Sequence, residues 1–393
     1  MYEYIAHAST VTPMRRVYHC LGRVGAPDAG IRARRLLEGG WARLLPRSLL
    51  EKLIRKDAFS VVGAAADAPL VRSMTSACAL EPGSCLVCSA ATRSLLSPPV
   101  AAAVAAAPNQ RPPPSWVAGL AVLHHSRHLL AVSKPAGLPT QSGDGGEQSI
   151  EAALKFLAPP PEGRLRIVHR LDTSVSGVVL LAKTLAGARA LSAALREASL
   201  LAAAAPPAAM VQGKGLRKGY IGLVVSANPG LLSAASLRGS KRVSLALEGS
   251  SIQGTVRAGV RTHDDKIEQG VTRFAVGARG REGSHFLTAL FLEPLTGRRH
   301  QLRQHTARTL CAGAGGLYGD AKYGGEAPRG DQPPGGSVFL HAAQVQIGGG
   351  LLPGDEEGIV VAAPLPQSWG PVLSRFGVRA EVLEAGLARF LAS

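Results

Sequence analysis

The chain has 393 residues, and its 44 Lys and Arg against 27 Asp and Glu give a formal net charge of +17. A surplus of this size favours a polyanionic partner, nucleic acid first and an acidic membrane surface second. A GC-rich genome gives a similar surplus without any function, so charge alone decides little. At this length we expect one large domain together with a smaller unit.

The sequence disfavours a membrane span, a disulfide scaffold and a metal site. A membrane-spanning helix needs about 20 consecutive apolar residues, and the longest uncharged stretch, 219–237, contains an Asn-Pro-Gly turn at 228–230. The five cysteines are odd in number and too few for a disulfide framework, which fits a reducing compartment. Cys85 and Cys88 form one Cys-x-x-Cys pair, but no second pair follows at zinc-site spacing. We therefore expect no metal.

Residues 1–40 form a basic N-terminal extension. They carry six arginines against three acidic residues, and no apolar core of a secretory signal follows Met1. An organelle transit peptide and an RNA-contacting tail both fit this composition. The expected location is therefore either the cytoplasm or an organelle such as the mitochondrion or plastid.

The rest of the chain divides into three parts. Residues 41–90 read as a small mixed unit, with a helix predicted at 45–55, a strand at Phe59–Val62 and a turn into a strand at 80–87. Residues 91–118 are a Pro/Ala-rich linker. Residues 119–385 are strand-rich and form the main domain. Two stretches within it, 202–213 and 326–336, look like insertions.

The first chemically suggestive motif is His-Arg-Leu-Asp at 169–172, with Ser176-Gly177 following it. The apolar run after Gly177 predicts a buried strand, so Asp172 lies on the loop that enters this strand. Asp172 is the only carboxylate between Glu162 and Glu197, and basic residues surround it. A carboxylate kept ionised by cations suits a nucleophile or general base. A structural Asp that caps the loop or pairs with Arg170 is the alternative.

A second motif, Thr-Gly-Arg-Arg-His-Gln-Leu-Arg, occupies 296–303. Thr296-Gly297 predicts a turn, and we expect residues 300–304 to form a strand. The arginines suit a phosphate or carboxylate clamp, and a solvated basic face is the alternative. A third motif, Gly-Asp-Ala-Lys-Tyr-Gly at 319–324, is a glycine-bounded turn that means little alone.

In this order, the three motifs resemble those of the RluA-type family of RNA pseudouridine synthases. Further segments are similar to that family, and the likeness extends over roughly residues 119–380: an opening strand and Lys-Pro-x-Gly turn at 130–139, a Lys-x-Tyr strand at 218–224, and closing segments at 340–342 and 363–366. The resemblance implies a mixed α/β (α+β) fold. Its long, mostly antiparallel sheet is flanked by helices, and the active cleft crosses its centre.

The resemblance also implies a reaction and the residues that carry it. Uridine in RNA is isomerised to pseudouridine without any cofactor, and Asp172 is the matching carboxylate, adding to C1′ or taking a sugar proton. Arg303 is its ion-pair partner, and Tyr220 stacks near the uracil as an acid–base partner. The remaining candidates contact RNA or position loops: Arg170, which holds the place of the extruded nucleotide, with His169, Lys134, Arg298 and His300.

Three further expectations follow from the resemblance. Residues 41–90 look like a degenerate S4 RNA-binding domain, with an unrelated helical extension as the alternative. The chain departs from the family pattern at Val175 and Arg299, where Thr is usual, but an active enzyme is still expected. The partner is ribosomal or transfer RNA, with no membrane and no nucleotide cofactor, and the chain is expected to be a monomer.

Two other functions remain open at this stage. In the first, the chain is an RNA-binding or ribosome-assembly protein built on an enzyme scaffold. In the second, it is a glycosylase that breaks the same glycosidic bond without rejoining it. Substitution of Asp172 separates the first alternative from a synthase, and release of free uracil identifies the second.

Overall fold

The structure is a computed structural model, and the chain separates into two compact units, Met1–Ala103 and Val104–Ser393. The boundary falls within the range 91–118 that we expected to be a linker. The following residues are described: 18–23, 59–62, 71–73, 85–89, 114–142, 148–157, 165–204, 215–238, 240–248, 251–262, 264, 266–325 and 337–393.

The first unit contains a four-stranded antiparallel sheet in the order β1-β4-β2-β3. Its strands are β1 (Tyr18–Arg23), β2 (Phe59–Val62), β3 (Val71–Ser73) and β4 (Cys85–Ser89). β2 and β4 lie where the sequence predicted strands. β1 lies within the basic extension and pairs with β4. The helix predicted at 45–55 lies outside the described residues, so the S4-like character of this unit stays a prediction.

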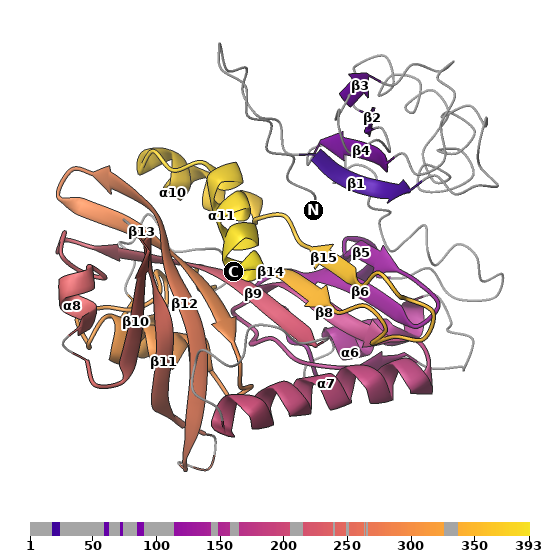
Figure 1. The fold of residues 1–393 in the computed structure, drawn as a ribbon, viewed down its shortest axis with the longest axis horizontal. Helices are drawn as coiled ribbons and strands as arrows, with labels where there is room; N and C mark the ends of the chain where they lie inside the picture. Colours follow the sequence, from indigo (N-terminus) through magenta and orange to yellow (C-terminus); the bar gives the residue numbers. More distant parts are fainter. Residues whose placement is uncertain are drawn as a thin grey trace. The chain divides into compact units, whose positions relative to one another are not determined.

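The second unit is built on one large sheet with helices packed against it (Figure 1). Its strands are β5 (Ala121–His125), β6 (Leu129–Lys134), β7 (Arg166–Ile167), β8 (Ser176–Ala182), β9 (Leu216–Ser226), β10 (Val243–Glu248), β11 (Ser251–Arg261), β12 (Ile267–Glu282), β13 (His285–Pro294), β14 (Leu340–Ile347) and β15 (Ile359–Ala362). Its α-helices are α5 (Ser115–Ala118), α6 (Ile150–Ala153), α7 (Leu185–Ala204), α8 (Ala234–Arg238), α9 (Gln301–His305), α10 (Gly370–Arg375) and α11 (Ala380–Ala392).

Short turns of other helix types complete the unit: 3-10 turns at Leu154–Phe156, Ala321–Tyr323 and Gln367–Trp369, and a π turn at Thr306–Leu310. None of the described helices is both long and apolar enough to cross a membrane. The expected insertion at 326–336, and most of the one at 202–213, lie outside the described residues.

The large sheet has the strand order β10-β11-β12-β13-β9-β14-β8-β6-β5, with β15 beside β14 and β7 beside β8. Neighbouring strands are antiparallel except β8 and β14, which are parallel. The prediction of a mixed α/β fold with a long, mostly antiparallel sheet is therefore confirmed. β8, β9 and β14 lie at its centre. The loop before β8 carries Asp172, and Tyr220 lies on β9.

β8 begins four residues after Asp172, and every residue in it is buried. This confirms the buried strand predicted from the apolar run, and it fixes the end of the loop that carries Asp172. Gly177 pairs with Ala342 at the parallel junction with β14 and has φ +120°. A Cβ at this position would collide with the Ala342 backbone, so only glycine fits there.

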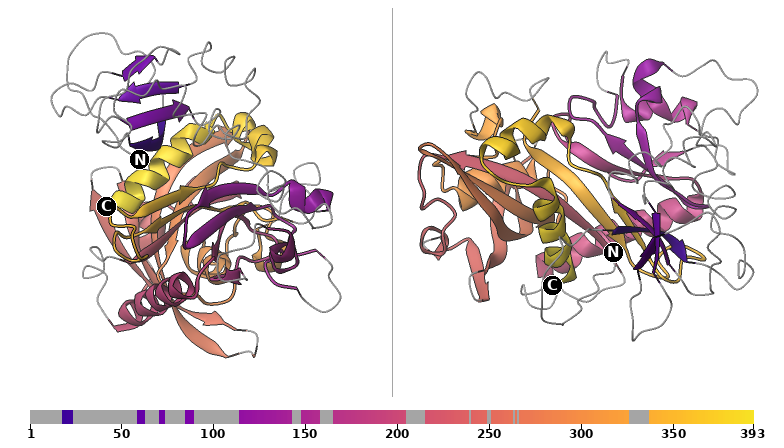
Figure 2. Two further views of the ribbon diagram at one scale, coloured as in Figure 1. Left: turned by 90° about the vertical axis from the view of Figure 1, so that its right-hand side faces the viewer. Right: turned by 90° about the horizontal axis from the view of Figure 1, so that it is seen from above.

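The side chains of β9 point alternately to the two faces of the sheet, as in any β-strand. Ile221 and Leu223 belong to the core beneath α11. A Cβ on Gly219 would meet Leu391 of that helix, so glycine permits its close approach. Figure 2 shows α11 lying against one side of the sheet. Tyr220 points to the other side, where the pockets described below are found.

The segment 300–304 is not the strand that the sequence predicted. It forms most of α9, and all five residues of that helix are buried. His300 precedes it in a left-handed conformation with φ 53°. The Gln301 carboxamide oxygen accepts hydrogen bonds from Thr296 Oγ1 (2.6 Å) and Arg298 N (3.1 Å). These bonds hold the turn that leads into α9, and Gln304 N donates a 2.9 Å hydrogen bond to His300 O, as in an α-helix.

Candidate active site

Two adjoining pockets, with volumes of about 410 and 280 Å³, open beside the loop that carries Asp172. We call them the larger and the smaller pocket. Six residues line both pockets: Arg170, Leu171, Asp172, Arg299, His300 and Arg303. Asp172 therefore lies at the junction of two cavities whose walls are rich in cationic side chains.

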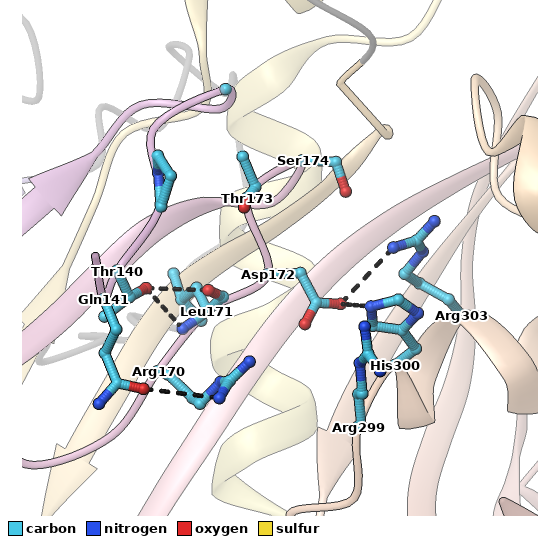
Figure 3. A pocket seen from close by; sticks show the side chains of 12 residues that line it. Thr140, Gln141, Arg170, Leu171, Asp172, Thr173, Ser174, Arg299, His300 and Arg303 are labelled. Atoms are coloured by element: carbon cyan, nitrogen blue, oxygen red, sulfur yellow. Dashed lines mark hydrogen bonds and ion pairs between the residues drawn. The ribbon is translucent and has the colours of Figure 1, made fainter. Parts of the chain in front are cut away.

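The Asp172 carboxylate faces two basic side chains (Figure 3). Its Oδ2 lies 3.7 Å from Arg303 Nη1 and 3.8 Å from His300 Nε2. The Asp172 side chain is 22% exposed, so the carboxylate remains open to the pockets. An acid in this setting can pair with cations and still contact a bound molecule.

Arg303 owes its position to a second carboxylate. Its Nε and Nη2 each donate a 2.7 Å hydrogen bond to Asp320, whose side chain is only 1% exposed. Burial works against the charge of Arg303, but the bonds to Asp320 and the charges of Asp320 and Asp172 raise its pKa above the ordinary value. The bidentate grip leaves Nη1 directed towards Asp172.

His300 is oriented by Tyr323. Its Nδ1 lies 3.0 Å from Tyr323 Oη, and the two rings meet edge to face. Burial lowers the pKa of His300, and the Asp172 charge opposes part of this shift. The left-handed backbone at His300 is uncommon for a residue other than glycine and brings the imidazole into both pockets.

Tyr220 lies in the smaller pocket on β9 and is 8% exposed. Burial, followed by the Asp172 charge, raises the pKa of its phenol far above the ordinary value. The phenol therefore stays protonated and is a weak acid, so Tyr220 can stack on a base or donate a hydrogen bond. Lys218 lines the same pocket, and burial lowers its pKa to about 8.

The loop that carries Asp172 is anchored to the segment after β6. Lys134 is completely buried, and its Nζ donates to the carbonyls of Leu138 (2.7 Å), Pro135 (3.0 Å) and Thr173 (3.3 Å). Burial lowers the pKa of Lys134 to about 7, and the Asp172 charge opposes this shift. Of the two roles expected for Lys134, this geometry is that of loop positioning, because no phosphate reaches the buried ammonium.

Thr140 is a second anchor of the same loop. Its Oγ1 donates to Leu171 O (2.8 Å) and accepts from Leu171 N (3.0 Å). One side chain thus satisfies the N–H and the C=O of Leu171, the residue before Asp172, and ties the loop to the segment after β6.

The remaining predicted residues are placed differently from one another. His169 Nε2 accepts a 3.2 Å hydrogen bond from Leu180 N on β8, and burial lowers its pKa to about 3. His169 therefore anchors the start of the loop and lines neither pocket. Arg170 is exposed and lines both pockets, and its Nη1 lies 3.5 Å from Gln141 Oε1. Arg298 lines the smaller pocket and forms a 2.6 Å ion pair with Glu268.

The structure thus brings six of the eight predicted residues to the pockets, leaving out Lys134 and His169. Our site prediction had omitted Asp320, Tyr323 and Thr140. The first two belong to the Gly-Asp-x-x-Tyr-Gly motif, which was an available signal. No local sequence signal pointed to Thr140, because its partner Leu171 lies 31 positions away. Among the described residues, no cluster of three or more His, Cys, Asp or Glu side chains is arranged to hold a metal ion.

Comparison with known proteins gives consistent results. A family model described as RNA pseudouridylate synthase matches residues 128–308. The mitochondrial RNA pseudouridine synthase 4 of Arabidopsis thaliana is 34% identical over 215 residues, which are 54% of this chain and 42% of that protein. This chain therefore spans less than half of that relative.

A bacterial relative is covered more completely. The ribosomal large subunit pseudouridine synthase C of Escherichia coli is 30% identical over 263 residues, which are 64% of this chain and 69% of that protein. A solved human structure, RNA Pseudouridylate Synthase Domain Containing 4, matches this chain with a TM-score of 0.43 and 22% identity. The match covers 66% of this chain and 93% of the human chain. From the family match and the extent of the bacterial relative, this chain belongs to the RNA pseudouridylate synthases.

Proposed function

We propose that this chain isomerises specific uridines of ribosomal RNA to pseudouridine, with Asp172 as the essential carboxylate. The observation that carries the proposal is the Asp172 carboxylate at the junction of two cation-lined pockets, with Arg303 Nη1 at 3.7 Å. The bacterial relative is named for the ribosomal large subunit, which supports ribosomal RNA over transfer RNA as the substrate class.

The isomerisation breaks the N1–C1′ bond, turns the uracil and joins C5 to C1′. Asp172 acts on the sugar, either by adding to C1′ or by taking a sugar proton. Arg303 is the ion-pair partner of Asp172, and the neutral phenol of Tyr220 packs against the uracil in the smaller pocket. No redox change or group transfer is involved, so the residues described above suffice without a cofactor.

The target base has to leave its stack before it reaches Asp172, at a cost of a few kcal/mol. Arg170 is exposed beside Asp172 and is suited to occupy the space that the base vacates. Arg298 and Arg299 follow the turn after β13 and are suited to backbone phosphates. Substrates should therefore present the uridine in a loop or a weak helix.

The N-terminal residues extend the same proposal. Residues 41–90 act as an S4-like RNA-binding unit, and the chain works as a monomer with RNA as its only macromolecular partner. The positive net charge of +17 supports an RNA partner.

Pseudouridine mapping of total RNA tests the function. Cells with the intact protein are compared with cells that lack it and with cells that carry only Asp172→Asn. The matched control is Glu357→Gln, which removes one charge from an exposed position on the loop before β15. A discrete set of ribosomal sites should disappear in the null and Asp172→Asn lines and persist in the control.

Other results would select the alternatives. Sites that persist in the Asp172→Asn line but vanish without the protein indicate an RNA-binding or assembly role. Sites in transfer RNA alone overturn the substrate class. Free uracil released from RNA by the purified chain indicates a glycosylase.

A further inference from the structure

The proposed isomerisation leaves one proton unaccounted for. When C5 attacks C1′, C5 becomes tetrahedral and carries both its original hydrogen and the sugar. This hydrogen has to leave as a proton, so that the C5–H electron pair restores the C5=C6 double bond. A base near C5 is therefore required, and its identity is an inference that rests on the proposed function.

Most side chains in the pockets are unsuited to this task. Tyr220 stays protonated because burial raises the pKa of its phenol. Arg303 and Arg299 are cations at any working pH. Asp172 has to act at the sugar. Lys218 lies in the smaller pocket, but its pKa of about 8 leaves it mainly protonated at neutral pH.

His300 has the properties that the step requires. Its side chain lines both pockets and is 14% exposed, so it is accessible but partly shielded from water. Its pKa is lowered by burial, so that the imidazole is neutral at neutral pH. Neutral imidazole is the commonest general base in enzymes.

The distance to Asp172 places His300 at the reacting atoms. Nε2 lies 3.8 Å from Asp172 Oδ2, the atom that has to reach the sugar. After rejoining, C5 is bonded directly to C1′, so a base beside the Asp172 carboxylate is also beside the C5 hydrogen. The carboxylate is again an anion at that stage, whichever role it played at the sugar. Its charge then favours protonation of His300.

Tyr323 supplies the required tautomer. When Nδ1 carries the hydrogen of the neutral imidazole, Tyr323 Oη at 3.0 Å accepts it, and the lone pair of Nε2 faces the pockets. The edge-to-face contact between the two rings restricts rotation of the imidazole. The left-handed backbone conformation of His300 sets the direction in which its side chain leaves the main chain.

We infer that His300 Nε2 accepts the proton from C5 after the C5–C1′ bond has formed. The C5–H pair becomes the C5=C6 double bond, the N1=C6 pair moves to N1, and N1 takes a proton from water. His300 then returns its proton to solvent. Atoms and charge balance, and the net change is transfer of one proton from C5 to N1.

The test uses the full chain and a transcript of large-subunit ribosomal RNA that contains uridine, 5-deuterouridine or 5-fluorouridine. Fluorine cannot leave C5 as a cation, so the fluorinated substrate stops after rejoining and reports only the earlier steps. The variants are His300→Gln, which keeps a polar side chain but cannot accept the proton, Tyr323→Phe and Asp172→Asn.

His300→Gln should slow single-turnover conversion of uridine by about 100-fold. It should show a larger 5-deuterium isotope effect than wild type, yet rejoin 5-fluorouridine at the wild-type rate. Equal slowing on uridine and 5-fluorouridine, or an unchanged isotope effect, overturns the inference and leaves His300 a structural role.

Two further variants keep the test decisive. If thermal melting shows that His300→Gln fails to fold, Tyr323→Phe carries the test, because it removes only the Nδ1 partner. It should raise the isotope effect and spare 5-fluorouridine, and an unchanged isotope effect overturns the inference. Asp172→Asn should block both substrates. Activity of that variant would reject the proposed function itself.

Discussion

Arg303 donates two 2.7 Å hydrogen bonds to the buried carboxylate of Asp320. Its contact with Asp172 is longer, at 3.7 Å. Arg303 is thus fixed by a residue outside the pockets and presents its remaining nitrogen to the residue inside them. Asp320 belongs to a turn whose Tyr323 also holds His300, so one turn positions both basic partners of Asp172.

This arrangement predicts the effect of Asp320→Asn. The substitution removes the buried charge and one acceptor, and breaking a buried ion pair costs about 3–5 kcal/mol of unfolding free energy. Arg303 should then turn towards Asp172, and the maximal rate should fall by more than tenfold while RNA affinity changes little. Denaturant unfolding and single-turnover kinetics measure the two effects. A stability loss with an unchanged rate would contradict a positioning role.

Thr140→Val should disturb the catalytic loop. The substitution keeps the shape of the side chain but leaves the buried N–H and C=O of Leu171 without their partner. Each unsatisfied group costs about 1–3 kcal/mol, and the rate should fall with the stability. Thr140→Ser retains the hydroxyl and should restore both. Failure of serine to restore the rate would show that the methyl group, and not the hydrogen bonds, is what matters.

Arg299→Gln should weaken RNA binding through electrostatics. Arg299 is exposed and lines both pockets, and we interpret it as a phosphate contact. Loss of one phosphate contact reduces the slope of log affinity against log salt by about one. Arg389→Gln, on the exposed side of α11, is the matched control and should leave the slope unchanged. Equal slopes for wild type and Arg299→Gln would rule out this contact.

The pH dependence of the rate should report His300. Its base form is required, so the rate should fall as pH drops through its pKa, which burial places below the ordinary 6.5. The charged and titratable groups that act on it are Asp172, Arg303, Lys322, Arg299 and Tyr323. Because the Arg299 charge lowers the pKa of His300, Arg299→Gln should move the acidic midpoint to higher pH.

Single-turnover rates across the acidic range measure this midpoint. The pH–rate profile of His300→Gln should lack the acidic titration whose midpoint shifts in Arg299→Gln. An identical acidic midpoint in wild type, Arg299→Gln and His300→Gln would assign the titration to another group.

Much of the fold could be predicted because local signals agreed with it. The apolar run after Gly177 favoured a buried strand, which is β8. The strand at 218–224 was expected from the family resemblance, and it lies within β9. Residues 300–304 misled us because their polarity and spacing resemble an exposed strand. The turn before α9 is held by hydrogen bonds from Thr296 and Arg298 to the Gln301 side chain, and residue propensities do not predict such bonds.

The site was predictable to the extent that its residues lie in motifs. Asp172, Arg303 and His300 do so, and they meet at one carboxylate. The anchors were harder to predict because they depend on contacts between distant segments. Lys134 is followed by Pro-Ala-Gly and looks like an exposed turn residue, but its ammonium is enclosed by three carbonyls. Only the folded chain shows that the Lys134 ammonium donates its hydrogen bonds to backbone carbonyls of the loop segments.

The central claim is that Asp172 catalyses formation of pseudouridine. The most direct measurement incubates the purified full chain, and its Asp172→Asn variant, with an unmodified transcript of large-subunit ribosomal RNA, and quantifies pseudouridine after complete digestion. The wild-type chain should form pseudouridine at defined positions without free uracil, and the variant should bind the transcript but form none. Equal pseudouridine formation by both proteins would contradict the account.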